Sequence, residues 1–266
     1  MDDRPIGIFD SGVGGLTVAH QLRRVLPHES TIYVGDTARV PYGSKTKETL
    51  LSYGRDIIKF LLTKNVKAVI LACGTSSANT YQQLQEEFPQ IKLIDVLRPG
   101  VAACASMLAV NPQLRLGLIA TEATVRSGLF ETLLKEKSPT ANIISRPCPL
   151  FASMVEAGHA TKPGDPILQF VSDNYLADLR GQIDALVLGC THYPLLTAIL
   201  TATLGQIQFI NLAESTAAAA KTQLSTQLST KTKPTHQFYV SGSTEIFQQT
   251  AKQIFGEDCV AGKVEY

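Results

Sequence analysis

The sequence lacks the features by which several classes of protein are recognised. It has no apolar run of the ~18 residues that a membrane-spanning helix requires, and no block rich in lysine or arginine. Its 24 basic residues are balanced by 23 acidic ones, so it lacks the excess positive charge that neutralises nucleic-acid phosphates. Without a CxxC pair, a zinc site is not expected. We therefore expect no metal, no membrane and no nucleic acid as the primary partner.

Cysteine is scarce and widely spaced. The chain has five, an odd number, and its first residues (MDDRPIGIF) are acidic and only briefly apolar, unlike a signal peptide. These features are typical of a cytoplasmic protein with reduced thiols. The remaining composition, 44% hydrophobic and 18% charged among 266 residues, is that of an ordinary globular protein with one large or two small domains.

Short, continuously apolar segments alternate with segments of helical periodicity. Continuous apolar strands are buried on both faces of a sheet, and their alternation with helices predicts parallel α/β sheets. The sequence RPG at 98–100 is expected to break the chain. Strands are expected at 5–9, 31–36, 68–73, 92–97, 114–121, 142–148, 183–190, 207–211 and 236–242. The main helices are expected at 16–26, 46–64, 101–110, 123–136, 167–179, 193–205, 214–228 and 245–255, and a further helix is expected to follow the strand at 68–73 and to extend through Phe88.

A weak internal repeat relates the two parts of the chain. Residues 6–18 parallel residues 116–128, and residues 67–75 (KAVILACGT) parallel residues 184–192 (DALVLGCTH). The repeat predicts two similar halves, each with a thiol at the carboxyl end of a strand. Open parallel sheets bind their ligands at that end.

Two loops between expected strands and helices could contact a ligand. The glycine loop FDSGVGG (9–15) matches neither phosphate-binding pattern, and the Asp10 carboxylate would attract an ammonium group and repel phosphate. A structural alternative is a tight glycine turn with Asp10 or Ser11 as a helix cap. The loop 40–46 carries Tyr42 as an amphipathic wall, although a structural turn is the more frequent reason for such a sequence.

Two cysteines stand where an expected strand becomes a helix. Cys73 lies in ACGTSSA and Cys190 in GCTHYP, and backbone N–H groups at a helix start lower the pKa of a thiol and bind carboxylates. His192 is close enough in sequence to exchange a proton with Cys190. The other cysteines, Cys104, Cys148 and Cys259, are interpreted as buried packing residues. Two opposed acid/base groups can remove a proton from one face of a stereocentre and return one to the other face.

The sequence resembles the glutamate racemases, cofactor-independent members of the aspartate/glutamate racemase superfamily. The resemblance covers nearly the whole chain and is clear up to about Asn211. It rests on the strings IGIFDSGVGGLTV, YVGDTARVPYG, ACGTSSA, ATVRSG, PLFASMVEAG and LGCTHYPLL. It implies racemisation of L- and D-glutamate without any cofactor, in agreement with the missing phosphate loop, and a product that supplies peptidoglycan. It also implies two α/β domains, residues 1–97 with 210–266 and residues 98–209, with the active site in the cleft between them.

The resemblance assigns roles to individual residues. Cys73 and Cys190 would be the catalytic acid/bases, the first for D-glutamate and the second for L-glutamate. Asp10 and His192 would assist them, and Glu156 would support His192. The substrate would be bound by these two assisting residues together with Ser11, Tyr42, Gly43, Gly74, Thr75 and Thr191.

Two departures from the family pattern matter, and other functions compete. Gly74 stands where the family usually has asparagine, so a side-chain amide that would hold the substrate is missing; Ala120 replaces a glycine. The alternatives are an aspartate or hydantoin racemase, a one-thiol decarboxylase and a catalytically silent binding or regulatory protein. The two intact thiols disfavour the last two. The sequence does not specify the oligomeric state, and a homodimer is among the assemblies considered.

Overall fold

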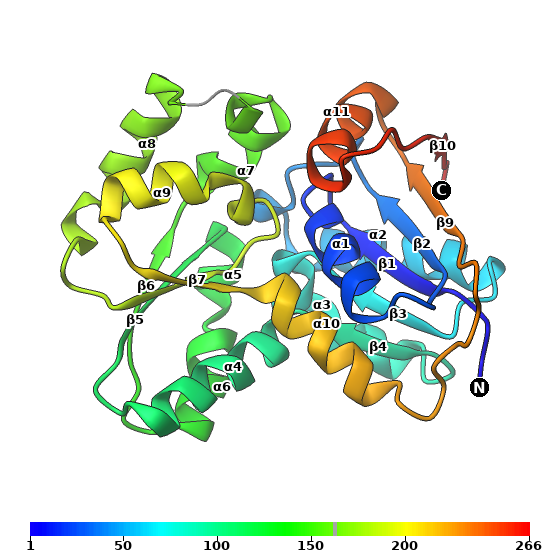
Figure 1. Ribbon diagram of the computed structural model, residues 1–266, viewed down its shortest axis with the longest axis horizontal. Coiled ribbons are helices and arrows are strands. Elements are labelled where there is room, and N and C mark those ends of the chain that lie inside the picture. Colours follow the sequence, from blue (N-terminus) through cyan, green and yellow to red (C-terminus); the bar gives the residue numbers. More distant parts are fainter. Residues whose placement is uncertain (162–163) are drawn as a thin grey trace.

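The computed structural model describes residues 1–161 and 164–266. It contains two parallel sheets, each covered by helices on both faces, which form two α/β domains side by side (Figure 1). This confirms the predicted fold class. The first sheet has the order β10-β9-β2-β1-β3-β4, with strands β1 (Ile6–Asp10), β2 (Thr31–Gly35), β3 (Ala68–Leu71), β4 (Lys92–Asp95), β9 (His236–Val240) and β10 (Ala261–Lys263). The second has the order β6-β5-β7-β8, with strands β5 (Arg115–Ala120), β6 (Asn142–Pro147), β7 (Ala185–Leu188) and β8 (Gln208–Asn211).

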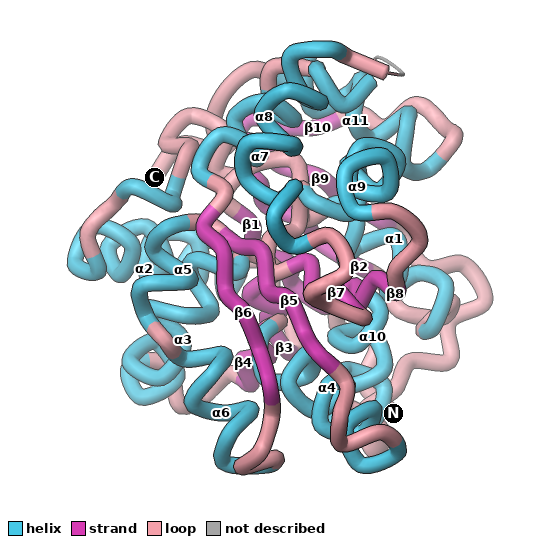
Figure 2. The backbone as a smooth tube through the Cα atoms, turned by 90° about the vertical axis from the view of Figure 1, so that its left-hand side faces the viewer, coloured by secondary structure: helices cyan, strands magenta, loops and turns pink. Residues whose placement is uncertain are grey.

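The two sheets repeat one strand order. The first sheet contains the run β2-β1-β3-β4, and the second, seen in front in Figure 2, has the corresponding run β6-β5-β7-β8. Strand β3 therefore corresponds to β7, as the sequence repeat predicts. The first sheet is extended by β9 and β10, which the chain adds after it has completed the second sheet.

Helices cover both faces of each sheet. One face of the first sheet packs against α1 (Leu16–Val25), α10 (Leu212–Gln223) and α11 (Thr244–Phe255), and the other against α2 (Lys47–Thr63) and α3 (Gly74–Glu87). One face of the second sheet packs against α4 (Leu97–Val110) and α6 (Leu129–Lys137), and the other against α7 (Pro149–Glu156), α8 (Pro166–Leu176) and α9 (Thr197–Leu204). A short helix, α5 (Glu122–Ser127), follows β5 and contacts α3. No helix in the described ranges has both the length and the apolar content needed to span a bilayer.

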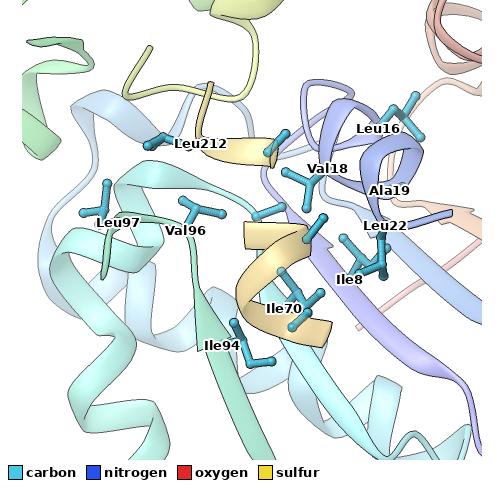
Figure 3. Close-up of a cluster of buried hydrophobic side chains, with 14 of the residues drawn as sticks. Ile8, Leu16, Val18, Ala19, Leu22, Ile70, Ile94, Val96, Leu97 and Leu212 are labelled. Atoms are coloured by element: carbon cyan, nitrogen blue, oxygen red, sulfur yellow. The ribbon is translucent and has the colours of Figure 1, made fainter. Parts of the chain in front are cut away.

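Alternate residues of the central strands serve different cores. Ile8 and Ile70 belong to the cluster with α1 and α10, whereas Phe9 and Leu71 belong to the cluster with α2 and α3. Figure 3 shows part of the first cluster, in which residues of α1 and of the strands pack with Leu212, the first residue of α10, and with Leu97, the first residue of α4. Burial on both faces explains why these strands are continuously apolar in the sequence.

The structure differs from the predicted elements at several turns. The segment 98–100 does not break the chain, because α4 begins at Leu97 and Pro99 lies in its first turn, where a missing N–H costs no helical bond. Gly100 lets α4 approach α10, since a Cβ there would lie 2.2 Å from Leu212. The helix expected at 123–136 is interrupted by Gly128, whose φ of +62° favours glycine.

Other differences concern helix ends and elements that were not anticipated. Helix α10 ends at Gln223, so residues 224–228 lie beyond it. The helix expected at 193–205 begins as a 3₁₀ turn, Tyr193–Leu196, before α9. Helix α7 and strand β10 were not expected. Helix α7 is the consequential omission, because its last residue is Glu156.

Candidate active site

Both thiols of the two repeats line one cavity between the domains. Cys73 follows β3 and Cys190 follows β7, and their side chains share a cavity of about 70 Å³. It is also lined by the predicted residues Ser11, Tyr42, Gly43, Gly74, Thr75, Thr191 and His192. Asp10 and Glu156 do not line the cavity but lie behind this layer, in contact with its residues. The repeat therefore brings the two cysteines into one small site.

Cys73 lies in the apolar core of the first domain, with the Asp10 carboxyl, the Ser76 N–H and the Ser11 and Ser76 hydroxyls beside it. It is the N-cap residue of α3, with extended backbone angles, and it is almost fully buried. Burial raises the pKa of the Cys73 thiol, and the nearby Asp10 raises it further, against the opposing effect of the Ser11 and Ser76 hydroxyls. These surroundings favour the protonated thiol in the absence of a ligand.

Asp10 connects the two halves of the site. Its carboxylate accepts hydrogen bonds from the Gly12 N–H at 3.0 Å and from the Thr191 hydroxyl at 3.2 Å. Complete burial raises the pKa of Asp10, whereas nearby His192 and the Gly12 N–H act in the opposite direction. Asp10 thus lies next to Cys73 in the first domain and is bonded to the cysteine loop of the second.

Cys190 faces a buried histidine–glutamate pair. Its Sγ lies 3.5 Å from Nδ1 of His192, and Nε2 of His192 lies 2.6 Å from Oε1 of Glu156. Burial raises the pKa of Glu156, but the hydrogen bond from His192, the charge of His192 and the Val13 N–H together outweigh it, and the pKa is lowered overall. An ionised carboxylate only accepts hydrogen bonds, so Nε2 of His192 carries a proton.

The charge state of His192 is set by these same neighbours. Burial alone would lower the pKa of His192, but Cys190 and Glu156 outweigh it and raise the pKa well above the ordinary value. A protonated ring donates to Glu156 through Nε2 and faces the cysteine sulfur through Nδ1. This arrangement can pass a proton to and from Cys190.

The glycine loop is present because side chains of the other domain come too close for a Cβ. A Cβ at Gly12 would lie 2.1 Å from Oε1 of Glu156, and one at Gly14 would lie 2.6 Å from Nδ1 of His192. The predicted helix cap is wrong, because neither Asp10 nor Ser11 caps α1, whose N-cap is Gly15 without a side-chain bond. The role of the Asp10 carboxylate in attracting an ammonium group stays a prediction.

The loop at 40–46 is both a turn and a wall of the cavity. Residues 42–44 form a 3₁₀ turn, and the buried Tyr42 donates its hydroxyl hydrogen to Asp36. Gly43 packs against Thr121 of the second domain, and a Cβ on Gly43 would lie 2.9 Å from the Cβ of Thr121. The backbone of this loop therefore forms the predicted turn, and the side chain of Tyr42 lines the cavity. Contact of Tyr42 with a ligand stays a prediction.

Gly74 lies directly against the cysteine loop of the second domain. A Cβ on Gly74 would lie 2.4 Å from the backbone oxygen of Gly189, the residue before Cys190. Beside it, the hydroxyls of Thr75 and Thr121 are 2.8 Å apart and join the domains across the cavity. Because residue 74 has no side chain, the two cysteine loops lie closer together than a larger residue at this position would allow.

Several cavity residues were not predicted from the sequence. They are Val40, Pro41, Ser44, Thr121, Glu122, Pro149 and Ala152. Thr121 could have been found, because the repeat offset of 110 that relates residues 6–18 to 116–128 places it opposite Ser11. Within residues 1–161 and 164–266, no three His, Cys, Asp or Glu side chains are grouped as metal ligands.

Comparison with known proteins adds an independent observation. The model of the Asp/Glu/hydantoin racemase family matches residues 16–221. Over 259 residues the chain is 39% identical to the glutamate racemase of Oceanobacillus iheyensis, a match that covers 96% of this chain and 93% of that protein.

Solved structures agree with this match. The glutamate racemase isoform RacE1 of Bacillus anthracis superimposes with a TM-score of 0.91 at 34% identity, covering 100% of this chain and 98% of that one. The glutamate racemase of Francisella tularensis in complex with D-glutamate gives a TM-score of 0.88 at 34% identity, with the same coverage.

Proposed function

The chain belongs to the Asp/Glu/hydantoin racemase family, and from that premise we propose that it interconverts L- and D-glutamate. The reaction moves the α-proton and makes or breaks no other bond. The substrate is a small molecule, in keeping with a cavity of about 70 Å³. The D-glutamate produced supplies peptidoglycan synthesis. The family resemblance and the site chemistry require no cofactor for this reaction.

The observation that carries this proposal is the pair of thiols on one cavity, one from each domain. Racemisation needs one group to remove the α-proton and another to deliver a proton to the opposite face. With D-glutamate, the Cys73 thiolate takes the α-proton and the Cys190 thiol donates one. With L-glutamate the roles are exchanged. In each direction one thiol begins as the base and the other as the acid, so the net charge of the pair is unchanged.

The remaining residues bind the substrate and stabilise developing charge. The start of α3 beside Gly74 and Thr75 offers backbone N–H groups to a carboxylate, and Thr121 and Thr191 offer hydroxyl donors from the other domain. Asp10, deep in the site beside Cys73, favours the substrate ammonium. Donors of this kind lower the energy of the carbanion-like transition state, since the α-proton of an amino acid is only weakly acidic.

The test is a stereochemical assay on purified protein that has been dialysed against a chelator, with no pyridoxal phosphate added. Circular dichroism should show loss of optical activity from either glutamate enantiomer at comparable final ratios. D-Aspartate is the parallel substrate, and faster reaction with aspartate would favour the aspartate-type alternative. Absence of racemisation with both, or activity that appears only when zinc or pyridoxal phosphate is supplied, would overturn the proposal.

We also propose a cytoplasmic location and a homodimer. The first is supported by five free thiols, which persist in a reducing compartment. Light scattering coupled to size-exclusion chromatography tests the second, because a measured mass of 28.7 kDa, that of the monomer, would contradict it.

A further inference from the structure

The glycine loop of the first domain contacts the groups that serve Cys190 in the second. The Val13 N–H donates to Oε1 of Glu156 at 3.0 Å, and the same oxygen accepts from Nε2 of His192 at 2.6 Å. Gly12 lies against that carboxylate, and Gly14 lies against the His192 ring. A chain of contacts therefore runs from Val13 through Glu156 and His192 to Cys190, and its first link crosses between domains.

We propose that the glycine loop is a positioning element for Cys190, and that the acid–base support of this thiol is complete only while the two domains are in contact. Glu156 is held by one donor from each domain. If the first domain moves away, Oε1 loses the Val13 N–H, and the space beside Gly12 no longer confines the carboxylate. The inference relies on the proposed function for the reaction that Cys190 performs, but not for the contacts themselves.

Three ionisable groups face His192, and they come from different elements. Cys190 precedes it on the same loop, Glu156 comes from the end of α7, and Asp10 comes from the end of β1. Of these, Glu156 makes the shortest contact with the ring, 2.6 Å to Nε2, and it is the one that the glycine loop touches. Displacing Glu156 removes a neighbouring negative charge from His192, so the ring loses its proton more readily. A neutral ring stabilises the Cys190 thiolate less than a charged one does.

Cys73 lacks this chain of contacts. The groups that act on it are Asp10, Ser11 and Ser76, all from the first domain. Gly12 also donates its N–H to Asp10, so the variant that leaves this bond in place, Glu156→Gln, is the one expected to alter Cys190 and spare Cys73 most cleanly. This selectivity separates a positioning role from a general loss of structure.

The experiment measures the reactivity of each thiol without any substrate. Wild-type protein and Gly12→Ala are treated with iodoacetamide between pH 6 and pH 9, and alkylation of the two cysteine peptides is followed by mass spectrometry. In Gly12→Ala, Cys190 should react about tenfold more slowly at pH 7, which is the change produced when the interaction of its thiolate with His192 weakens by about 1.4 kcal/mol. Cys73 should change less than twofold.

A control variant introduces a methyl group at another crowded glycine of the first domain, away from the site. A Cβ at Gly54 would lie 2.7 Å from Leu84, within the packing of α2 on α3. Gly54→Ala should change the midpoint of thermal unfolding without changing the ratio of the two alkylation rates. Glu156→Gln is the second variant, for use if Gly12→Ala does not fold. It keeps the size of the side chain and removes its charge.

The outcomes are distinct. Selective slowing of Cys190 in Gly12→Ala or Glu156→Gln supports the positioning role. Unchanged Cys190 reactivity in the folded variants, or equal slowing of both thiols, overturns it. If the variants show the selective effect but the wild-type protein racemises no glutamate, the proposed function is overturned and the coupling between domains is retained.

Discussion

The loops after β3 and β7 occupy the same place in two sheets of the same strand order, yet they give their cysteines different surroundings. Cys73 begins a helix of 14 residues and has hydroxyl groups and a buried carboxyl beside it. Cys190 leads into a 3₁₀ turn and faces the ionised pair of His192 and Glu156. Topology therefore determines the positions of the two thiols, whereas the chemical groups next to each thiol differ between the two loops.

Removing either thiol is the most severe way to break this comparison. We expect Cys73→Ser and Cys190→Ser each to lower racemisation by about 10²–10⁴-fold, because one missing acid/base group interrupts proton transfer in both directions. Circular dichroism measures the loss. In D₂O, Cys190→Ser should still exchange the α-hydrogen of D-glutamate, and Cys73→Ser that of L-glutamate. Full activity of either variant would falsify the two-thiol mechanism.

Replacing Glu156 should expose the difference between the loops as a pH dependence of stability. The raised pKa of His192 gives stability that is present below its ordinary value of 6.5 and is lost as pH rises through the raised value. The lowered pKa of Glu156 gives stability that is present above 4.5 and is lost as pH falls. The pair therefore contributes most from about pH 5 to above pH 6.5.

Glu156→Gln should cost about 1.5–3 kcal/mol at pH 6, the usual contribution of a hydrogen bond to a charged group. The cost should shrink at pH 9.5, as His192 loses its proton. Urea unfolding at the two values measures both. A cost that grows with pH would contradict the assignment of the ion pair.

A side chain introduced at Gly74 should have a smaller effect than the changes at the thiols or at Glu156. It tests the place where the two cysteine loops lie against each other. The sequence alone favours a gain in affinity for Gly74→Asn, because the family amide would be restored. The structure reverses that expectation, since the Cβ would lie 2.4 Å from the oxygen of Gly189. Crowding of this kind costs about 1–3 kcal/mol, so we expect kcat/KM to fall about tenfold.

Gly74→Ala separates volume from chemistry at this position. If both variants lose activity equally, the narrow cleft is the cause. A lower KM for glutamate in Gly74→Asn alone would restore the amide explanation and show that the loops separate easily.

The elements that could be predicted are those whose cause is local. Continuous apolar strands such as 68–71 are visible in the sequence because both faces are buried, and the repeat around Cys73 and Cys190 predicts their shared place at two strand ends. The errors also have local causes. Pro99 suggests a break but suits the first turn of a helix, and Gly128 interrupts a periodic segment through its positive φ.

The contacts that complete the site could not be predicted in the same way. Val13 and Glu156 are separated by 143 positions, and no spacing rule connects a glycine loop to a carboxylate on another domain. Glu156 was proposed through family resemblance only, and its helix was missed. The sequence suggests that the glycines of the loop are needed for a tight turn, whereas the structure shows that Glu156 and His192 leave no space for a side chain there. This steric constraint arises only when the two domains are packed together.

The return of the chain to its first sheet has a consequence for synthesis. Strand β9 pairs with β2 in register from Thr31 with His236 to Gly35 with Val240, so β2 waits for a partner about two hundred positions downstream. At about 5–20 residues per second, the ribosome needs roughly 10–40 s to supply it. During that time β2 is an open strand edge, which is a template for pairing with other chains. Nascent chains that stall before residue 236 should therefore depend on chaperones, although both cysteine loops have already been made.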